Sequence, residues 1–295
     1  MAKILDRMKQ LFVIGFIAVF FAACSKDEKT VETGVPAITV QNIAYATADP
    51  LENMDVYLPA GRTATSTNCV VVIHGGSWSS GDKADMDSAL NAFRLLLPNY
   101  ATFNINYRLA NGSTIVSSNQ MDDVNAAVNF IVTKASEYKV NANKIIIVGA
   151  SAGAHLGMLK AYKYNSDGRV KAMIDLFGPT DLSWMYNSQP YYLSLTQAVL
   201  TNFMGTTQPA NPTLYQMASP INFVSAAAPP TQILHGTADS IVPVRESQRL
   251  NVALQTANVT HEFITIAGGG HGTWDNASWT NAYAKMTAFI KTYVP

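Results

Sequence analysis

Few residues of this sequence carry charge, and this shortage excludes one class of partner. Of the 295 residues, 14% are charged, against about 25% in an average globular protein. Acidic and basic residues each number 20, so the net charge is zero. Because no basic run is present that could follow a phosphate backbone, nucleic acid is excluded as a partner. The hydrophobic fraction of 48% is enough to bury a large core, which excludes a disordered chain.

Cysteine is also scarce, since only Cys24 and Cys69 occur. Neither belongs to a C-x-x-C pair or to a cluster of cysteine and histidine. A zinc site of the structural type is therefore excluded, and we predict no metal site.

The apolar run near the N-terminus, Leu11–Phe21, is too short to span a bilayer. As a helix it covers about 17 Å, against ~30 Å for the hydrocarbon core. Lys3, Arg7 and Lys9 precede it, and the small residues Ala22 and Ala23 follow it. A basic start, a short apolar stretch and small residues before a cleavage site are typical of a secretory signal peptide, here residues 1–23.

The end of this segment, Phe21-Ala22-Ala23-Cys24, resembles the lipobox of bacterial lipoproteins. The resemblance implies cleavage before Cys24 and acylation of its thiol; the alternative is an ordinary signal peptide with a chance cysteine. Residues 24–36 are polar and predict a flexible tether. Their start, Ser25-Lys26-Asp27-Glu28, resembles the acidic export signal of some Gram-negative surface lipoproteins. We therefore expect an outer-membrane lipoprotein of the bacterial envelope, held to the membrane only by its lipid anchor, with either a periplasmic or an outer-surface orientation.

Residues 37–295 alternate short apolar runs with longer amphipathic stretches, as in Met121–Tyr138. Two early runs, Val40–Tyr45 and Met54–Leu58, predict an antiparallel hairpin. Most of the later runs are continuous rather than alternating, which favours parallel strands buried on both faces. We predict a mostly parallel, doubly wound α/β sheet with helices on both faces. The later strand candidates are Val70–His74, Ala101–Asn106, Ile145–Val148, Met173–Phe177, Thr231–Leu234 and Glu262–Ile266.

The aromatic-rich segment of residues 183–217 is too long for a simple connection between a helix and a strand. It predicts a small cap over one end of the sheet. An ordinary two-helix insertion without a role in ligand binding is the alternative.

The pentapeptide Gly149-Ala150-Ser151-Ala152-Gly153 follows an apolar strand candidate and precedes a helical pattern. This is the context of a nucleophile elbow, in which a serine lies on a strained turn between strand and helix. The helix N-terminus supplies unpaired N–H groups and the positive end of a dipole. We predict Ser151 as the nucleophile of an acyl-transfer enzyme.

A serine nucleophile needs a base, and the base needs an orienting acid. In this arrangement the acid and then the histidine follow the serine in the chain. His271 lies in a glycine-rich loop after the last strand candidate, and we predict it as the base. His235 ends a strand, where packing or hydrogen bonding is its expected role, and His261 precedes the last strand at the opposite edge.

Asp239 lies in the loop after the strand candidate Thr231–Leu234 and is the predicted acid. A turn or helix-capping role is its alternative. Asp175, inside a strand candidate, and Asp181, at the start of the cap, come earlier than the order prefers.

The loop His74-Gly75-Gly76-Ser77-Trp78 follows another strand candidate. Its glycines let backbone N–H groups approach a substrate oxyanion, and the Ala152 N–H is the expected second contributor. We expect His74 to brace this loop.

Together, these motifs with Asn106–Ala110 and Ala154-His155-Leu156 resemble the hormone-sensitive-lipase and feruloyl-esterase-like (BD-FAE-like) branch of the α/β-hydrolases. The resemblance covers nearly all of Val40–Pro295. It implies the α/β-hydrolase fold and a carboxylesterase that needs no metal or organic cofactor. The implied catalytic triad is Ser151, Asp239 and His271, and the implied oxyanion donors are Gly76, Ser77 and Ala152.

Ser77 stands where this branch usually has a third glycine, which keeps the backbone donor and restricts bulky acyl groups. Several members of the branch remove acetyl or feruloyl groups from plant polysaccharides, so an acylated polysaccharide or a small ester is the implied substrate. The alternatives are a peptidase resembling the prolyl-oligopeptidase catalytic domain and a catalytically silent, glycan-binding lipoprotein. The acyl and alcohol specificities stay open.

Overall fold

One sheet of eight strands organises residues 34–295, the part of the chain that the computed structural model describes. The predicted signal peptide and Cys24 lie outside these residues. The strand order is β1-β2-β4-β3-β5-β6-β7-β8, and β2 runs opposite to the other seven strands. The strands are β1 Ile38–Ala44, β2 Asn53–Leu58, β3 Asn68–Ile73, β4 Ala101–Ile105, β5 Asn141–Ala150, β6 Val170–Leu176, β7 Thr231–Gly236 and β8 His261–Ile266.

The central strands are apolar along their whole length because each face of the sheet covers a separate core. In β5, Ile145 and Ile147 face one core, whereas Ile146 and Val148 face the other. All four side chains are fully buried. The prediction of a mostly parallel sheet with both faces covered is confirmed. β5 begins at Asn141, four residues before its predicted start, because Asn141 pairs with Asn68 across a register shift.

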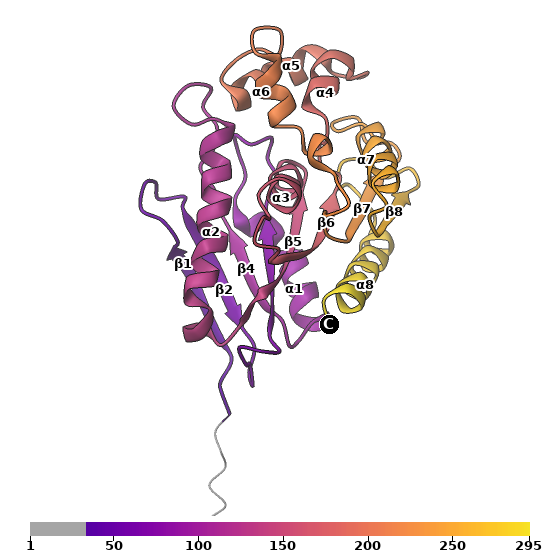
Figure 1. Ribbon diagram of the computed structural model, residues 1–295. Helices are drawn as coiled ribbons and strands as arrows, with labels where there is room; N and C mark the ends of the chain where they lie inside the picture. The colour runs from indigo at the N-terminus through magenta and orange to yellow at the C-terminus, as the bar shows by residue number, and fades with distance from the viewer. Residues whose placement is uncertain (1–33) are drawn as a thin grey trace, which may run out of the picture. The chain divides into compact units, whose positions relative to one another are not determined.

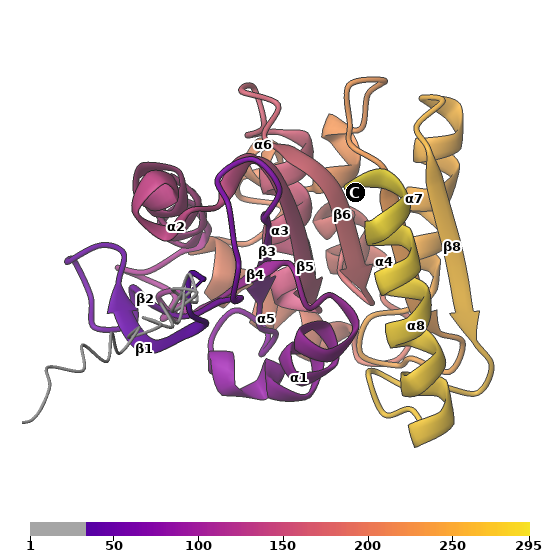
Figure 2. The same ribbon diagram turned by 90° about the horizontal axis from the view of Figure 1, so that it is seen from below.

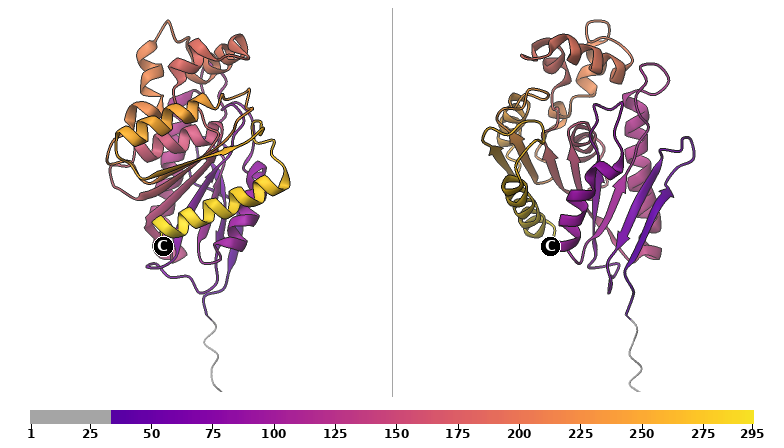
Figure 3. Two further views of the ribbon diagram at one scale, coloured as in Figure 1. Left: turned by 90° about the vertical axis from the view of Figure 1, so that its right-hand side faces the viewer. Right: turned by 180° about the vertical axis from the view of Figure 1, so that it is seen from behind.

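Helices cover both faces of the sheet. Figure 2 shows α2 and α3 on one side of the strands and α1 and α8 on the other. The helices α1 and α8 contact each other, and they lie side by side in the rear view of Figure 3. The helices flanking the sheet are η1 Lys83–Met86, α1 Asp87–Leu96, α2 Ser117–Tyr138, α3 Ala152–Tyr162, α7 Arg245–Thr256 and α8 Asn276–Tyr293.

The segment between β6 and β7 forms a small helical cap over one end of the sheet (Figure 1). Buried side chains of its helices, including Leu200 and Phe203, join the core of α2 and α3. Two hydrogen bonds close its base: Leu182 N donates to Ser219 Oγ at 2.9 Å, and Ile221 N donates to Thr180 O at 3.1 Å. The cap helices are α4 Leu182–Ser188, α5 Leu193–Met204, α6 Pro212–Met217 and η2 Pro220–Phe223.

The parallel strands end at the same edge of the sheet, so the loops after β3, β5, β7 and β8 gather there. These loops carry the predicted site residues. No helix in the part of the chain that the structure describes has the length and apolarity needed to span a bilayer.

Candidate active site

Ser151 lies at the turn between β5 and α3 with a strained backbone. Its φ of +53° and ψ of −119° lie in a region that residues other than glycine rarely adopt. The surroundings hold this conformation: Ser151 N donates to Leu176 O at 2.8 Å. This is the geometry of a nucleophile elbow, which presents the hydroxyl at the tip of the turn.

The two glycines of the pentapeptide are required by close backbone contacts. A Cβ on Gly153 would lie 2.2 Å from Ile73 O, and one on Gly149 would lie 2.4 Å from Gly153 O. Helix α3 therefore packs against the end of β3 at a distance that no side chain permits.

Hydrogen bonds join Ser151, His271 and Asp239 into one chain. His271 Nε2 lies 2.9 Å from Ser151 Oγ, and His271 Nδ1 lies 2.7 Å from Asp239 Oδ2. A carboxylate accepts, so Nδ1 carries the proton and Nε2 is free to accept the serine proton. The edge of the Phe177 ring contacts the imidazole, with centroids 4.8 Å apart.

Asp239 is buried and stays ionised because several donors surround it. Its Oδ1 accepts hydrogen bonds from the N–H groups of Ile241 and Val242, both at 2.9 Å. Burial by itself would raise the pKa of this carboxyl, but the hydrogen bonds from His235 and His271 outweigh burial and lower the pKa to about 2.

His235 is a second histidine on Asp239, and the sequence did not identify this contact. Its Nε2 lies 3.2 Å from Asp239 Oδ2 and 2.8 Å from Val242 O, and its Nδ1 lies 2.7 Å from Ser247 Oγ. The available signal was its position four residues before Asp239 at the end of β7. Unlike His235, His261 lies at the start of β8, where its Nδ1 is 2.7 Å from Val259 O.

The other two acidic candidates occupy different positions. Asp175 is fully buried in β6, where Oδ1 accepts from Gly178 N at 2.8 Å and Oδ2 has no partner among residues 34–295. Asp181 caps α4 by accepting from Trp184 N at 2.9 Å.

The loop after β3 offers backbone donors beside Ser151. Gly76 and Ser77 both have positive φ, at 109° and 51°. Within residues 34–295, the N–H groups of Gly76, Ser77 and Ala152 donate to no other protein atom. Ala152 is the first residue of α3, where N–H groups lack partners within the helix.

Trp78 fixes this loop through contacts that the sequence did not predict. Its carbonyl oxygen accepts from Ala110 N at 2.8 Å and Gln120 Nε2 at 2.7 Å. Its indole stacks on Phe203 of α5 at 4.3 Å and donates to His155 Nδ1 at 3.2 Å. At the other end of the loop, the buried His74 ring lies 4.4 Å from the Tyr107 ring and stacks on it.

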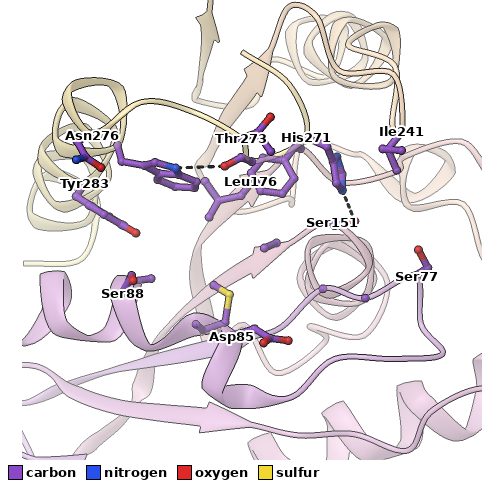
Figure 4. Close-up of a pocket in the computed structure, with 18 of the residues that line it drawn as sticks. Ser77, Asp85, Ser88, Ser151, Leu176, Ile241, His271, Thr273, Asn276 and Tyr283 are labelled. Atoms are coloured by element: carbon purple, nitrogen blue, oxygen red, sulfur yellow. Dashed lines mark hydrogen bonds between the residues drawn. The ribbon is translucent and has the colours of Figure 1, made fainter.

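Two hollows meet at Ser151, Ser77 and Ile241. The larger is a cleft of about 720 Å³ between the η1–α1 segment and α8. Figure 4 shows Asp85 and Ser88 on one wall of the cleft and Asn276 and Tyr283 on the other. The smaller is a pocket of about 150 Å³ beneath α4 and α5 of the cap. Anywhere in residues 34–295, the two hollows included, no group of three or more His, Cys, Asp or Glu side chains is placed to hold a metal ion.

The family model BD-FAE matches residues 54–254 of the chain. Among proteins of similar sequence, the probable carboxylic ester hydrolase LipM of Mycobacterium tuberculosis is 30% identical over 219 residues, or 70% of this chain and 49% of its own length. The chain spans about half the length of the curated relatives it matches.

Two solved structures are similar over 87% of the chain at 27% identity. One is a truncated carbohydrate esterase from gut microbiota, covered over 98% of its length with a TM-score of 0.70. The other is a bifunctional GH43-CE protein of Bacteroides eggerthii, covered over 38% with a TM-score of 0.72. The strand order, the elbow at Ser151 and the family match lead to the same assignment. The chain belongs to the BD-FAE family and has the α/β-hydrolase fold.

Proposed function

We propose that the protein hydrolyses carboxylic esters through a covalent acyl-enzyme on Ser151. The single observation that carries this proposal is the continuous chain of hydrogen bonds from Ser151 Oγ through His271 to Asp239. This chain supplies the base and the orienting acid that an alcohol nucleophile needs at neutral pH.

In the first half-reaction, His271 Nε2 takes the Ser151 proton while Oγ attacks the ester carbonyl carbon. The carbonyl oxygen becomes an oxyanion and accepts hydrogen bonds from the N–H groups of Gly76, Ser77 and Ala152. Loss of one such donor costs about 10²- to 10³-fold in kcat in a comparable hydrolase. The C–O bond of the ester then breaks, and the alcohol leaves with the proton from His271.

In the second half-reaction, water enters and gives a proton to His271 as its oxygen attacks the acyl-enzyme. The carboxylic acid leaves, and Ser151 regains its proton. Throughout, ionised Asp239 stabilises the imidazolium form of His271.

The substrate class in this proposal is an ester of a carbohydrate, with an acetyl or feruloyl acyl group. It is supported by the similarity to two solved structures whose names include a carbohydrate esterase and a GH43-CE protein. We further propose that Cys24 carries a lipid that holds the enzyme at the bacterial outer membrane.

Turnover of p-nitrophenyl acetate by the wild-type protein and by the Ser151→Ala variant tests the proposal. We expect hydrolysis by the wild type and none by Ser151→Ala. Ser136→Ala, at an exposed serine of α2, is the matched control and should keep full activity. An inactive wild type, or an active Ser151→Ala variant, would refute the mechanism.

A further inference from the structure

The cleft and the pocket beneath α4 and α5, called the cap pocket below, differ in their relation to His271. Both reach Ser151 and the oxyanion loop, but only the cleft is lined by His271 and the residues that follow it, Gly272 and Thr273. The cap pocket is lined on the other side of Ser151 by helices of the cap.

This difference indicates which hollow binds the alcohol part of an ester and which binds the acyl part. The leaving alcohol oxygen takes its proton from His271 Nε2 and must lie within hydrogen-bond reach of that atom. The alcohol therefore extends into the hollow that His271 lines. The acyl chain is bonded to the same carbon in a different direction, which leaves the cap pocket for it.

We infer that the cap pocket binds a short acyl group and that the cleft between α1 and α8 binds a sugar alcohol. This inference rests on the proposed esterase function and chooses between the acetyl and feruloyl groups that the proposal names. It predicts that acetyl and other short aliphatic esters are substrates and that feruloyl esters are not.

The cap pocket is small and apolar. Its lining includes Met185, Leu195, Val199 and Leu200. Its volume of about 150 Å³ is well below the roughly 300–1,000 Å³ of sites that enclose a whole drug-sized ligand. Each methylene that enters it should favour binding about fourfold until the pocket is full. A feruloyl group, with its substituted ring, is much bulkier than an acetyl or butyryl group and therefore fits this pocket worse.

The cleft has the composition of a sugar-binding site. Trp279 and Tyr283 of α8 line it, with ring centroids 5.4 Å apart in a stacked arrangement. Asp85, Ser88 and Asn276 add exposed polar groups around these rings. Trp279 also stacks on Trp274 at 4.4 Å, so the half-buried rings of Trp279 and Tyr283 offer the cleft the parts of their surfaces that these contacts leave exposed. A sugar presents both C–H groups and hydroxyl groups, which match apolar ring atoms bordered by polar side chains.

Substitutions that narrow one hollow at a time test which part of the ester each hollow binds. Val199→Phe narrows the cap pocket, and Ser88→Trp narrows the cleft. Val252→Phe, on the exposed face of α7, and Ser136→Trp, near the far end of α2, are the matched controls. Leu195→Trp is a second cap variant whose position is 61% exposed, so the substitution leaves the fold intact.

Each variant is measured on two ester series. The acyl series comprises p-nitrophenyl acetate, butyrate and hexanoate; the alcohol series comprises p-nitrophenyl acetate and monoacetylated xylobiose. We expect Val199→Phe and Leu195→Trp to lower the butyrate-to-acetate ratio of kcat/KM about tenfold without changing the alcohol series. We expect Ser88→Trp to lower the xylobiose-to-p-nitrophenyl ratio about tenfold without changing the acyl series.

The reverse pattern, or no selective change in either series, would overturn the inference while leaving the esterase function in place. Efficient hydrolysis of methyl ferulate by the wild type would also overturn it. A wild type that hydrolyses none of these esters would refute the proposed function itself, so the two failures are distinguishable.

Discussion

Trp78 Nε1 donates a hydrogen bond to Nδ1 of His155, 3.2 Å away, and this bond fixes the tautomer of a fully buried imidazole. The proton of His155 must then be on Nε2, which lies 2.7 Å from Ala218 O at the end of the cap. Burial lowers the pKa of His155 to about 4, so the ring stays neutral at physiological pH. One uncharged imidazole thus joins the loop of Ser77, helix α3 and the cap.

Replacing His155 should therefore impair catalysis more than substrate binding. In His155→Phe the Trp78 indole loses its acceptor, and the oxyanion donor of the adjacent Ser77 loses its fixed position. We expect kcat on p-nitrophenyl acetate to fall tenfold to a hundredfold with KM changed less than threefold. Trp78→Phe should behave alike, and the double variant should lose no more than either single variant. Full additivity of the two losses would contradict a shared role.

The Asp239→Asn variant should fold and be nearly inactive. An asparagine oxygen can still accept from the N–H groups of Ile241 and Val242, which preserves the loop. Its amide group, however, would favour the wrong tautomer of His271, an effect on the order of 10⁴-fold in kcat in a related triad. Steady-state kinetics and urea denaturation measure the two properties. A rate near that of the wild type would place the orienting acid elsewhere.

Glu246 should make stability depend on pH. Its Oε2 accepts from Thr180 N at 2.6 Å and Asp181 N at 2.7 Å at the base of the cap, while Oε1 is buried without a partner in the part of the chain that the structure describes. Burial raises the pKa of this carboxyl from 4.5 to about 7. The folded state therefore holds the Glu246 proton more tightly than the unfolded state does. The stabilisation that comes from this bound proton is complete below pH 4.5 and is lost as the pH rises through about 7.

Melting temperatures of the wild type and Glu246→Gln across pH 4 to 8 test this dependence. The glutamine cannot ionise, so the advantage of the wild type over Glu246→Gln should shrink as the pH rises. Glu137→Gln, at an exposed position of α2, is the control and should show a constant difference. A constant difference for Glu246→Gln as well would mean that its carboxyl ionises normally.

Cys24→Ala should release the protein from the membrane. Without the thiol no acyl chain can attach at this position, so the proposed link to the membrane is lost. Fractionation of a Gram-negative host expressing the full chain measures this, with Cys69→Ala as the matched control, because Cys69 is buried in β3. If Cys24→Ala stays in the membrane fraction as the wild type does, lipidation at Cys24 is wrong.

The sheet was predictable from the sequence because burial on both faces makes the central strands continuously apolar. Val70–Ile73 and Ile145–Val148 have no polar member, and a helix-sized amphipathic stretch separates them from the next strand. The gathering of Ser151, Asp239 and His271 at one edge also follows from chain order, since each comes directly after a parallel strand.

The sequence could not reveal contacts between side chains that lie far apart in the chain. Trp78 and His155 are 77 residues apart, and no sequence pattern predicts a hydrogen bond between two residues at that separation. The cleft depends on α1 and α8, which come from opposite ends of the described chain and meet only in the folded protein. The partition of the site into two hollows therefore required coordinates.

The closed base of the cap has a consequence for how this protein could change over evolutionary time. The bonds from Leu182 to Ser219 and from Ile221 to Thr180 fasten the two ends of the insertion together, and Leu200 and Phe203 pack its underside on the core. Exchange or lengthening of residues 183–217 alters the walls of the cap pocket while the strand pairing that positions Ser151 stays unchanged. A new substrate preference can thus be acquired by changing one segment, as long as Phe203 is kept, because its ring packs on Trp78 of the oxyanion loop.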